Sequence, residues 1–218
     1  MNGIVIQLQE EALNKDTDIL TLLRKAYFIA RKLKLKEFEK WIESEQNGYS
    51  TDLEDVPSYR RVRGEIKAWN PYSGWIPVIF GRDIGIEEYY VHDSIANLVS
   101  IYSDSKNNTC VVNFCADMNA FLNKSSTAPF QTKYCLQISK NAIFNIFEQV
   151  KNRILDWTIT LEENGIVGEG LNFAEEEQKK ALQNPSIVNY TNNFFSSVDN
   201  SQIQQDSKES TQIKCKMI

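Results

Sequence analysis

The chain has 218 residues, 42% of them hydrophobic, which is enough apolar material for a folded domain with a core of its own. Its 24 Lys and Arg residues against 29 Asp and Glu residues give a net charge of −5, which argues against duplex nucleic acid as the main partner. No apolar run approaches the roughly 20 residues of a membrane-spanning helix, and the four cysteines are not closely paired. We therefore expect a soluble, cytoplasmic protein with reduced thiols and no membrane segment.

The first 49 residues have the pattern of three helices. Apolar residues recur at spacings of three and four from Ile19 to Leu33, and again from Phe38 to Ile42. Residues 16–18 carry oxygens that can cap the second helix, and Asn47-Gly48 is typical of a helix end. These signals predict a compact antiparallel unit of three helices.

Residues 61–80 have the pattern of a β-hairpin. Small and apolar residues alternate with charged ones, as in a half-buried strand, at Val62, Gly64, Ile66 and Ala68. Turn residues follow at 70–74, and the apolar run 75–80 then predicts a second strand. Pro77 favours an edge or a bulge because proline has no backbone N–H to donate.

The middle of the chain predicts a short helix followed by two further strands. The helix covers residues 95–102, with Asp93 as its N-cap. The strands cover residues 109–115 and 130–138, with a helical turn over 117–123 between them.

The longest predicted helix begins after Ser139, whose hydroxyl can cap it, and continues to Gly165. A short helix is expected over residues 172–183. Trp41 and Trp157 both lie on apolar helical stripes, so we expect both rings to be buried.

The predicted fold class is therefore α+β, with an N-terminal three-helix unit, a small mainly antiparallel sheet, a long C-terminal helix packed on it and a polar tail. The domain is expected to cover residues 1–184, helical over 1–49 and mixed over 57–184. Of the 34 residues after Asn184, 16 are Ser, Thr, Asn or Gln, which predicts a flexible tail over 185–218.

No catalytic or metal-binding pattern is present in the sequence. His92 is the only histidine and has no second histidine or nearby arginine with which to share acid and base roles, so we expect a surface or loop residue. With one histidine and isolated cysteines we predict no metal site, no cofactor and no catalytic residue. The glycines of residues 165–170 lack the Lys-Ser/Thr of a phosphate-binding loop and indicate a loop that ends the long helix.

The best candidate binding patch combines aromatic and polar residues around the hairpin: Tyr59, Arg60, Arg63, Asn70, Trp75 and Glu45. Planar guanidinium groups and aromatic faces suit phosphates and nucleobases. The alternative is that the aromatic rings fill the sheet core while the arginines form surface ion pairs. The glutamates of the third helix, Glu37, Glu39, Glu43 and Glu45, are expected on a solvated face.

The tail contains one short internal repeat, because the Ser/Thr-Gln-Ile pattern of residues 201–203 recurs at residues 211–213. Short strands from several chains could pair through polar ladders and small apolar anchors, which predicts a homo-oligomer. The candidate assembly residues are Ser201, Gln202, Ile203, Gln204, Thr211, Gln212 and Ile213. The alternative is a disordered linker.

Several short motifs occur together along most of the chain: Leu22-Leu23-Arg24-Lys25-Ala26, Trp41-Ile42-Glu43-Ser44-Glu45, Pro57-Ser58-Tyr59-Arg60, Asn70-Pro71-Tyr72-Ser73-Gly74-Trp75 and Asn152-Arg153-Ile154-Leu155-Asp156-Trp157. In this order and at these separations they resemble the AbiTii family. The resemblance implies a bacterial protein of abortive phage infection, in which infected cells die or stop growing before phage matures. It implies no mechanism, and the matched residues specify a fold more clearly than a reaction.

We expect a non-enzymatic defence protein that acts by associating with a phage or host protein. The first alternative is an enzyme, a nuclease or nucleotide-acting toxic effector, that uses Arg60 and Arg63 with a carboxylate such as Glu45. The second is a nucleotide-ligand sensor whose pocket combines Tyr59, Asn70 and Trp75.

Overall fold

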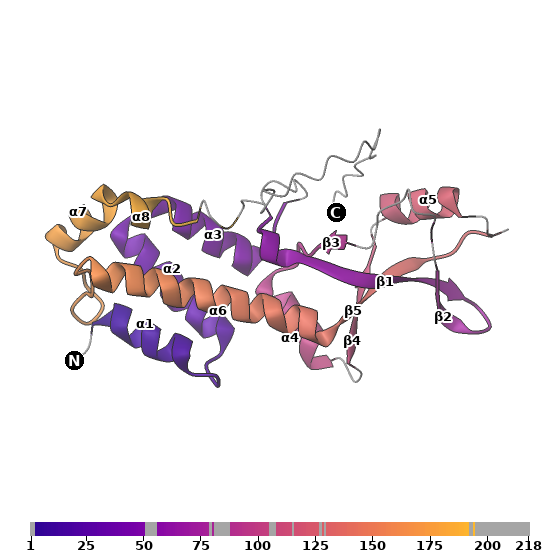
Figure 1. Ribbon diagram of the computed structural model, residues 1–218, viewed down its shortest axis with the longest axis horizontal. Helices are drawn as coiled ribbons and strands as arrows, with labels where there is room; N and C mark the ends of the chain where they lie inside the picture. The colour runs from indigo at the N-terminus through magenta and orange to yellow at the C-terminus, as the bar shows by residue number, and fades with distance from the viewer. Residues whose placement is uncertain are drawn as a thin grey trace, which may run out of the picture.

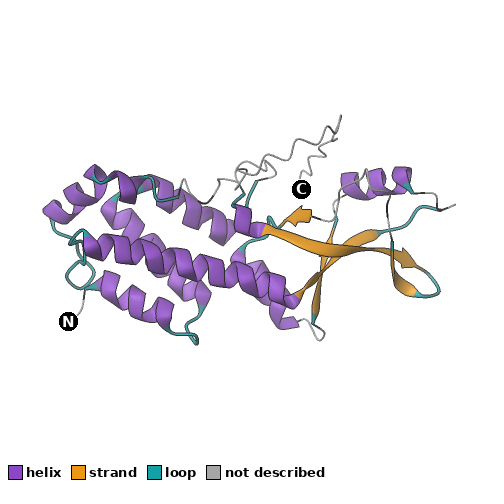
Figure 2. Ribbon diagram, viewed as in Figure 1, coloured by secondary structure: helices purple, strands orange, loops and turns teal. Residues whose placement is uncertain are grey.

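The structure is a computed structural model that describes residues 3–50, 56–78, 80, 88–104, 108–114, 116–126, 128, 130–191 and 194. The molecule is elongated, with most of its helices at one end and an antiparallel sheet toward the other (Figure 1, Figure 2). The α+β class predicted from the sequence is confirmed. The helices are α1 (Ile4–Leu13), α2 (Ile19–Leu33), α3 (Lys36–Asn47), α4 (Ile95–Asp104), α5 (Ala116–Ser125), α6 (Lys140–Glu163), α7 (Glu175–Gln183) and α8 (Pro185–Val188), with a short 3-10 helix, η2, over Ser58–Arg60.

The three N-terminal helices begin and end at residues that suit those positions. The Asp18 carboxylate accepts hydrogen bonds from the backbone N–H groups of Leu20 and Thr21 and so caps α2. Helix α3 ends at Asn47, and its C-cap is Gly48, whose φ of +93° favours glycine. A Cβ at Gly48 would also lie 2.9 Å from the carbonyl oxygen of His92, so this close approach of two chain segments requires glycine.

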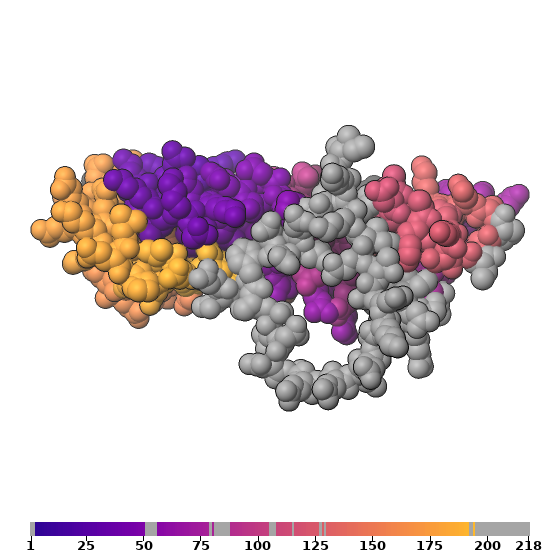
Figure 3. Space-filling view, turned by 90° about the horizontal axis from the view of Figure 1, so that it is seen from above, coloured from indigo at the N-terminus to yellow at the C-terminus, as the bar shows by residue number. Residues whose placement is uncertain are grey.

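Helix α6 joins the two ends of the molecule. Ser139 caps it by accepting a hydrogen bond from the backbone N–H of Ala142, as predicted. The helix follows strand β5 directly and then packs against α1, α2 and α4, so that only its beginning lies at the sheet. Figure 3 shows α7 and α8 beside the N-terminal helices at the same end of the molecule, and α2 contacts α7 while α3 contacts α8.

The sheet contains strands β1 (Arg61–Asn70), β2 (Gly74–Pro77), β3 (Glu88–Tyr90), β4 (Thr109–Asn113) and β5 (Tyr134–Ser139). Its order is β2-β1-β5-β4, with β3 also paired to β1, and each pair is antiparallel. The predicted alternation in β1 is confirmed, because Val62, Ile66 and Ala68 are buried. The hairpin and the edge position of Pro77, at the end of β2, are also confirmed.

The middle of the chain differs from the prediction in three places. Ser94 rather than Asp93 caps α4, because the helix begins at Ile95 and the Ser94 hydroxyl accepts a hydrogen bond from Asn97 N–H. The turn expected at 117–123 is a full helix, α5, whose Leu122 is buried. Strand β5 begins only at Tyr134, since the side chain of Asn123 takes both backbone groups of Thr132 as hydrogen-bond partners.

Packed structure continues beyond residue 184, where the sequence pattern predicted the start of the tail. Asn184 caps α8 by accepting from the backbone N–H of Ser186, and Ile187 is buried. Phe194 is also buried, with its ring centroid 5.1 Å from that of Trp41. An aromatic residue in this polar segment, Phe194, therefore packs on a surface formed by other segments. The composition of the segment alone does not reveal this packing.

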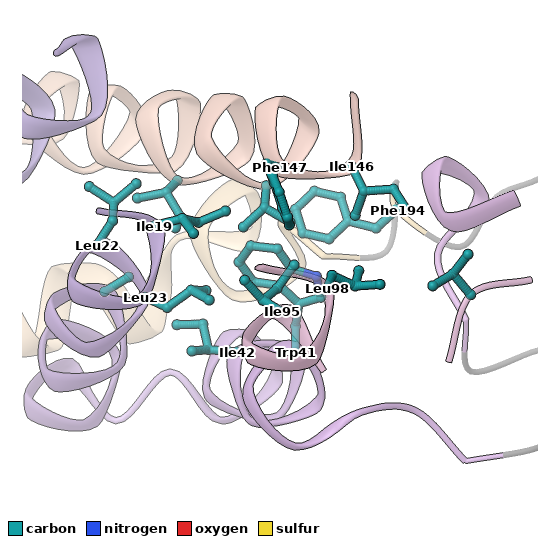
Figure 4. Packing of buried hydrophobic residues seen from close by; sticks show 14 of the residues in the cluster. Ile19, Leu22, Leu23, Trp41, Ile42, Ile95, Leu98, Ile146, Phe147 and Phe194 are labelled. Atoms are coloured by element: carbon teal, nitrogen blue, oxygen red, sulfur yellow. The ribbon is translucent and has the colours of Figure 1, made fainter. Parts of the chain in front are cut away.

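The core is shared by helices from distant parts of the sequence. Figure 4 shows side chains of α2, α3, α4 and α6 pointing into one apolar interior, with Phe194 among them. Trp41 and Trp157 are buried as expected, and the Trp157 ring stacks on Phe38 with their centroids 3.8 Å apart. No helix in the described ranges is both long enough and apolar enough to cross a bilayer.

Candidate functional site

The first cluster of candidate residues is a buried ion pair where the helical end meets the sheet. One guanidinium nitrogen of Arg60 lies 2.5 Å from Glu45 Oε2, and Arg60 Nε lies 3.2 Å from Glu45 Oε1. Both side chains are 0% exposed. The prediction of a solvated glutamate face on α3 is therefore wrong for Glu45, and also for Glu39, which is 6% exposed.

Two tyrosines complete the environment of the Glu45 carboxylate. Tyr49 and Tyr59 donate their hydroxyls to Oε1 at 2.5 Å and 2.6 Å, and Trp41 Nε1 donates to the Tyr59 hydroxyl at 2.9 Å. Burial, and then the charge of Glu45, raises the pKa of both tyrosines well above the ordinary value. Both phenols therefore remain protonated and act as donors.

Arg60 also ties α3 to the segment that precedes α4. Its Nη1 donates to the backbone carbonyls of Val91 at 2.9 Å and Asp93 at 2.7 Å. Burial alone would lower the pKa of Arg60, but the Glu45 carboxylate raises it above its ordinary value. With its donors directed at the carboxylate and two carbonyls, this guanidinium holds the junction together and does not face solvent.

Arg153 of α6 joins this cluster, although the sequence patterns did not single it out. Its guanidinium lies 4.1 Å from the centroid of the Tyr59 ring and 4.8 Å from that of Phe194. One available signal was its position four residues before the buried Trp157, which places both on one helical face. A similar signal existed for Glu45, which continues the buried stripe of Phe38, Trp41 and Ile42 at the same spacing.

An open hollow of about 520 Å³ lies beside Arg153, between α6 and the segment that follows α8. Two of its polar groups pair with each other, since the Tyr190 hydroxyl donates to Asp156 Oδ2 at 2.6 Å. Burial and this hydrogen bond raise the pKa of Tyr190. The Nε of Arg153, in contrast, is buried without a hydrogen-bond partner among the described residues.

Arg63 lies on the exposed part of β1, outside the buried cluster. Its guanidinium contacts Glu88 Oε1 at 2.9 Å, and Arg61 pairs with the other oxygen of the same carboxylate. These two arginines thus form surface ion pairs, as the alternative interpretation of the patch expected. Arg60 forms a buried ion pair instead.

Asn70 and Trp75 lie at the far end of the hairpin. The Asn70 side chain accepts hydrogen bonds from the backbone N–H groups of Tyr72 and Ser73, at 2.8 and 3.1 Å, and so shapes the turn. Trp75 pairs across the hairpin with Trp69, and their ring centroids are 5.4 Å apart. Unlike the rings at the junction, these two remain 37% and 44% exposed.

The exposed side chains at this end form what we call the hairpin-end surface: Trp69, Tyr72, Trp75, Ile76 and Phe130, which are 44%, 97%, 37%, 37% and 53% exposed. An open hollow of about 600 Å³ opens beside them. Trp69, Trp75 and Phe130 line it together with Pro71, Gln131 and Lys133, and none of the described residues that line it is acidic.

The structure thus brings together Glu45, Tyr59 and Arg60 but leaves Arg63, Asn70 and Trp75 apart from them. Arg63 lies only three residues from Arg60 but is exposed and pairs with Glu88. Asn70 and Trp75 lie at the other end of strand β1, whose ten residues span about 30 Å at about 3.3 Å per residue. Tyr59, Asn70 and Trp75 therefore do not line one shared pocket.

The remaining predictions concern His92, metals and the tail. His92 is a half-buried loop residue whose Nδ1 lies 2.8 Å from the Ser50 carbonyl oxygen. Within the described ranges, no group of three His, Cys, Asp or Glu side chains is placed to hold a metal ion. Cys110 and Cys135 are buried free thiols. The candidate assembly residues 201–204 and 211–213 lie outside the described residues.

Comparison with known proteins places these observations in a family. A family model described as AbiTii matches residues 3–185 and so covers all three segments that meet at the Glu45–Arg60 pair, as well as the hairpin. Curated proteins and solved structures contain no match to the chain. Because the match extends over most of the sequence, the chain belongs to the AbiTii family.

Proposed function

We propose that this chain acts in abortive-infection defence against phage by associating with a partner, and that the hairpin-end surface makes the contact. Membership of the AbiTii family supports the defence role. The proposal of association goes further and rests on the distribution of exposed and buried residues.

The observation that carries the proposal is the exposure of aromatic residues at one end of the molecule. Tyr72 is 97% exposed, and Trp69 and Trp75 remain partly exposed beside it at 44% and 37%. Tryptophan and tyrosine dominate the energetics of interfaces because they bury a large area with little loss of conformational freedom. A cluster of exposed tryptophan and tyrosine residues at one end of a hairpin is typical of a docking surface.

The enzymatic alternative required Arg60 and Glu45 to reach a substrate. A general acid or base must approach the reacting group to within hydrogen-bond distance. Both side chains are 0% exposed and are paired with each other. Their burial favours a structural role for this pair.

Phage challenge of bacteria that express the protein tests the proposal. We expect Tyr72→Ala combined with Trp75→Ala to lose protection while soluble yield and melting temperature stay close to those of the wild type. Leu13→Ala is a matched control, because Leu13 is an exposed apolar residue at the opposite end of the molecule. Full protection by the double variant would contradict the proposed role of the hairpin-end surface.

The tail remains proposed as an assembly element. Because Phe194 packs against Trp41 and Arg153, a truncation that tests it should remove residues 195–218 and leave Phe194 in place. Light scattering should then show a smaller assembly for the truncated protein than for the full chain. An identical mass per particle, after allowance for the deleted residues, would contradict the assembly role.

A further inference from the structure

We infer that the hairpin-end surface binds single-stranded nucleic acid, with unpaired bases stacked on Trp69, Trp75 and Phe130 and a phosphate beside Lys133. The inference rests on the proposed function, because both assign binding to the hairpin-end surface. It adds the chemical class of the partner. Its support comes from the strand register, the charge of the hollow and the rigidity of its walls.

The register of the sheet places two aromatic rings and a cation in one row. Trp69 lies directly opposite Trp75 in the β1–β2 pair, and directly paired residues share one face of a sheet. On the other side of β1, Trp69 N–H donates to the carbonyl of Lys133 at 2.9 Å. Lys133 also lies two residues before Cys135, the partner of Lys67, so it continues the same register and shares the face of Trp69.

The charge of this row differs from that of the whole chain. Elsewhere on the sheet, Arg61 and Arg63 pair with Glu88, and Lys67 pairs with Glu65. Lys133 is exposed and has no ion pair with any residue in the described ranges. Among the described residues that line it, the hollow therefore presents one available cation and no carboxylate. This charge complements a phosphate even though the chain carries a net charge of −5.

The walls of the hollow are held in place before any ligand binds. The Thr132 hydroxyl donates to the Trp69 carbonyl at 2.5 Å, and the Asn123 side chain both accepts from and donates to the backbone of Thr132 at 2.8 Å. Asn70 shapes the turn that carries Pro71. Fixed aromatic walls lower the entropic cost of binding, because few side chains must be ordered when the ligand arrives.

These features favour a single strand over a duplex. Aromatic rings bind nucleic acid by stacking on the flat faces of bases, and those faces are covered inside a duplex. A combination of aromatic platforms with a local cation is typical of proteins that bind single strands with little sequence preference. Surfaces that bind a protein partner also contain aromatic residues, but binding a protein does not require a cation in the hollow.

Intrinsic fluorescence gives a direct test, because the four tryptophans divide into two environments. Trp41 and Trp157 are 2% and 0% exposed, whereas Trp69 and Trp75 line the hollow. We expect a short oligothymidine to quench the exposed pair in a saturable manner, and a duplex of equal length to cause no saturable quenching. Absence of saturable quenching by the single strand would overturn the inference.

Three variants of the full chain identify the site. Trp75→Leu should raise the Kd for oligothymidine roughly tenfold, which is the effect of losing one base-stacking contact. Lys133→Gln should reduce the slope of log K against log salt by about 0.7, the value for one phosphate of a single strand. Val111→Ala, a change at an exposed apolar residue of β4 outside the hollow, should leave both quantities unchanged. Unchanged binding in both Trp75→Leu and Lys133→Gln would place any binding elsewhere and contradict the inference.

The phage-challenge result separates this inference from the proposed function. If the hairpin variants lose protection but no oligothymidine binds, the nucleic-acid inference is wrong and the surface binds a protein. If oligothymidine binds at the hollow but the hairpin variants still protect, the inference stands and the proposed role of this surface in defence is wrong.

Discussion

The junction between the helices and the sheet and the far end of the hairpin contain similar residues in opposite environments. Both combine aromatic rings with a basic residue, and η2 and strand β1 connect them directly. At the junction, Arg60 is 0% exposed and Trp41 is 2% exposed, whereas Trp69 and Tyr72 at the hairpin are 44% and 97% exposed. Residue type therefore does not separate a buried cluster from an exposed one.

The energetic consequences of the two environments differ as well. Removing one partner of a buried charge pair leaves the other charge without water or a counterion, and this is costly. Removing an exposed ring leaves its neighbours in water, where they were already partly solvated. Substitutions at the junction should therefore act through stability, and substitutions at the hairpin should act through binding.

The largest expected effect is that of Arg60→Ala. The change would leave the Glu45 carboxylate buried without its counterion and two backbone carbonyls without their donor, so we expect a loss of about 3–5 kcal/mol in the free energy of unfolding. Urea unfolding measures this loss. Glu88→Ala is the comparison at the surface and should cost at most about 1 kcal/mol, because its partner arginines are well exposed. Equal costs for the two variants would show that the Arg60 pair is open to water.

Trp157→Ala should have the second-largest effect, a loss of about 3 kcal/mol in the free energy of unfolding measured in urea. The reason is that the ring is fully buried and stacked on Phe38. Trp157→Phe should cost much less. Its indole N–H is buried without a hydrogen-bond partner among the described residues, so phenylalanine removes an unsatisfied donor along with some apolar area. A loss from Trp157→Phe as large as that from Trp157→Ala would indicate that the N–H has a partner.

His92 gives the junction a modest pH dependence. Burial lowers the pKa of His92 below its ordinary value, although the Ser50 carbonyl partly opposes this. The unfolded chain therefore takes up the proton first, so stability is present above the unfolded pKa of about 6.5 and is lost as pH falls through the folded pKa. Because His92 is the only histidine, its NMR titration is free of overlap and should give a pKa below about 6.5. His92→Gln should remove this part of the pH dependence of unfolding, and an unchanged profile would assign it to other groups.

The smallest expected effect on stability is that of Tyr72→Ser, at less than about 0.5 kcal/mol, because this side chain is 97% exposed. Thermal unfolding measures it beside the phage-challenge assay. A loss above about 1 kcal/mol would mean that the ring packs against the protein, and the contrast between the two regions would then disappear.

Local patterns in the sequence were sufficient for most of the elements. A cap within residues 16–18, the alternation in β1, the turn at 70–74 and the cap at Ser139 depend on interactions within a few residues, so a single segment reveals them. Family motifs were sufficient for membership of AbiTii, which the family model confirms over residues 3–185.

Only the tertiary structure decided what the charged and aromatic residues do. The Asp93 side chain was a candidate cap for α4, but the helix begins at Ile95, so Ser94 caps it. The Asp93 backbone carbonyl accepts a hydrogen bond from Arg60 of another segment. Glu45 belongs to a helix rich in charged residues, yet Arg60, Tyr49 and Tyr59 surround its carboxylate and make its burial favourable. Trp69 and Trp75 remain 44% and 37% exposed, although α5 lies at the same end of the sheet and contributes Asn123 to the hollow beside them. Burial and charge pairing depend on contacts between segments that are distant in the sequence. A local sequence pattern does not reveal those contacts.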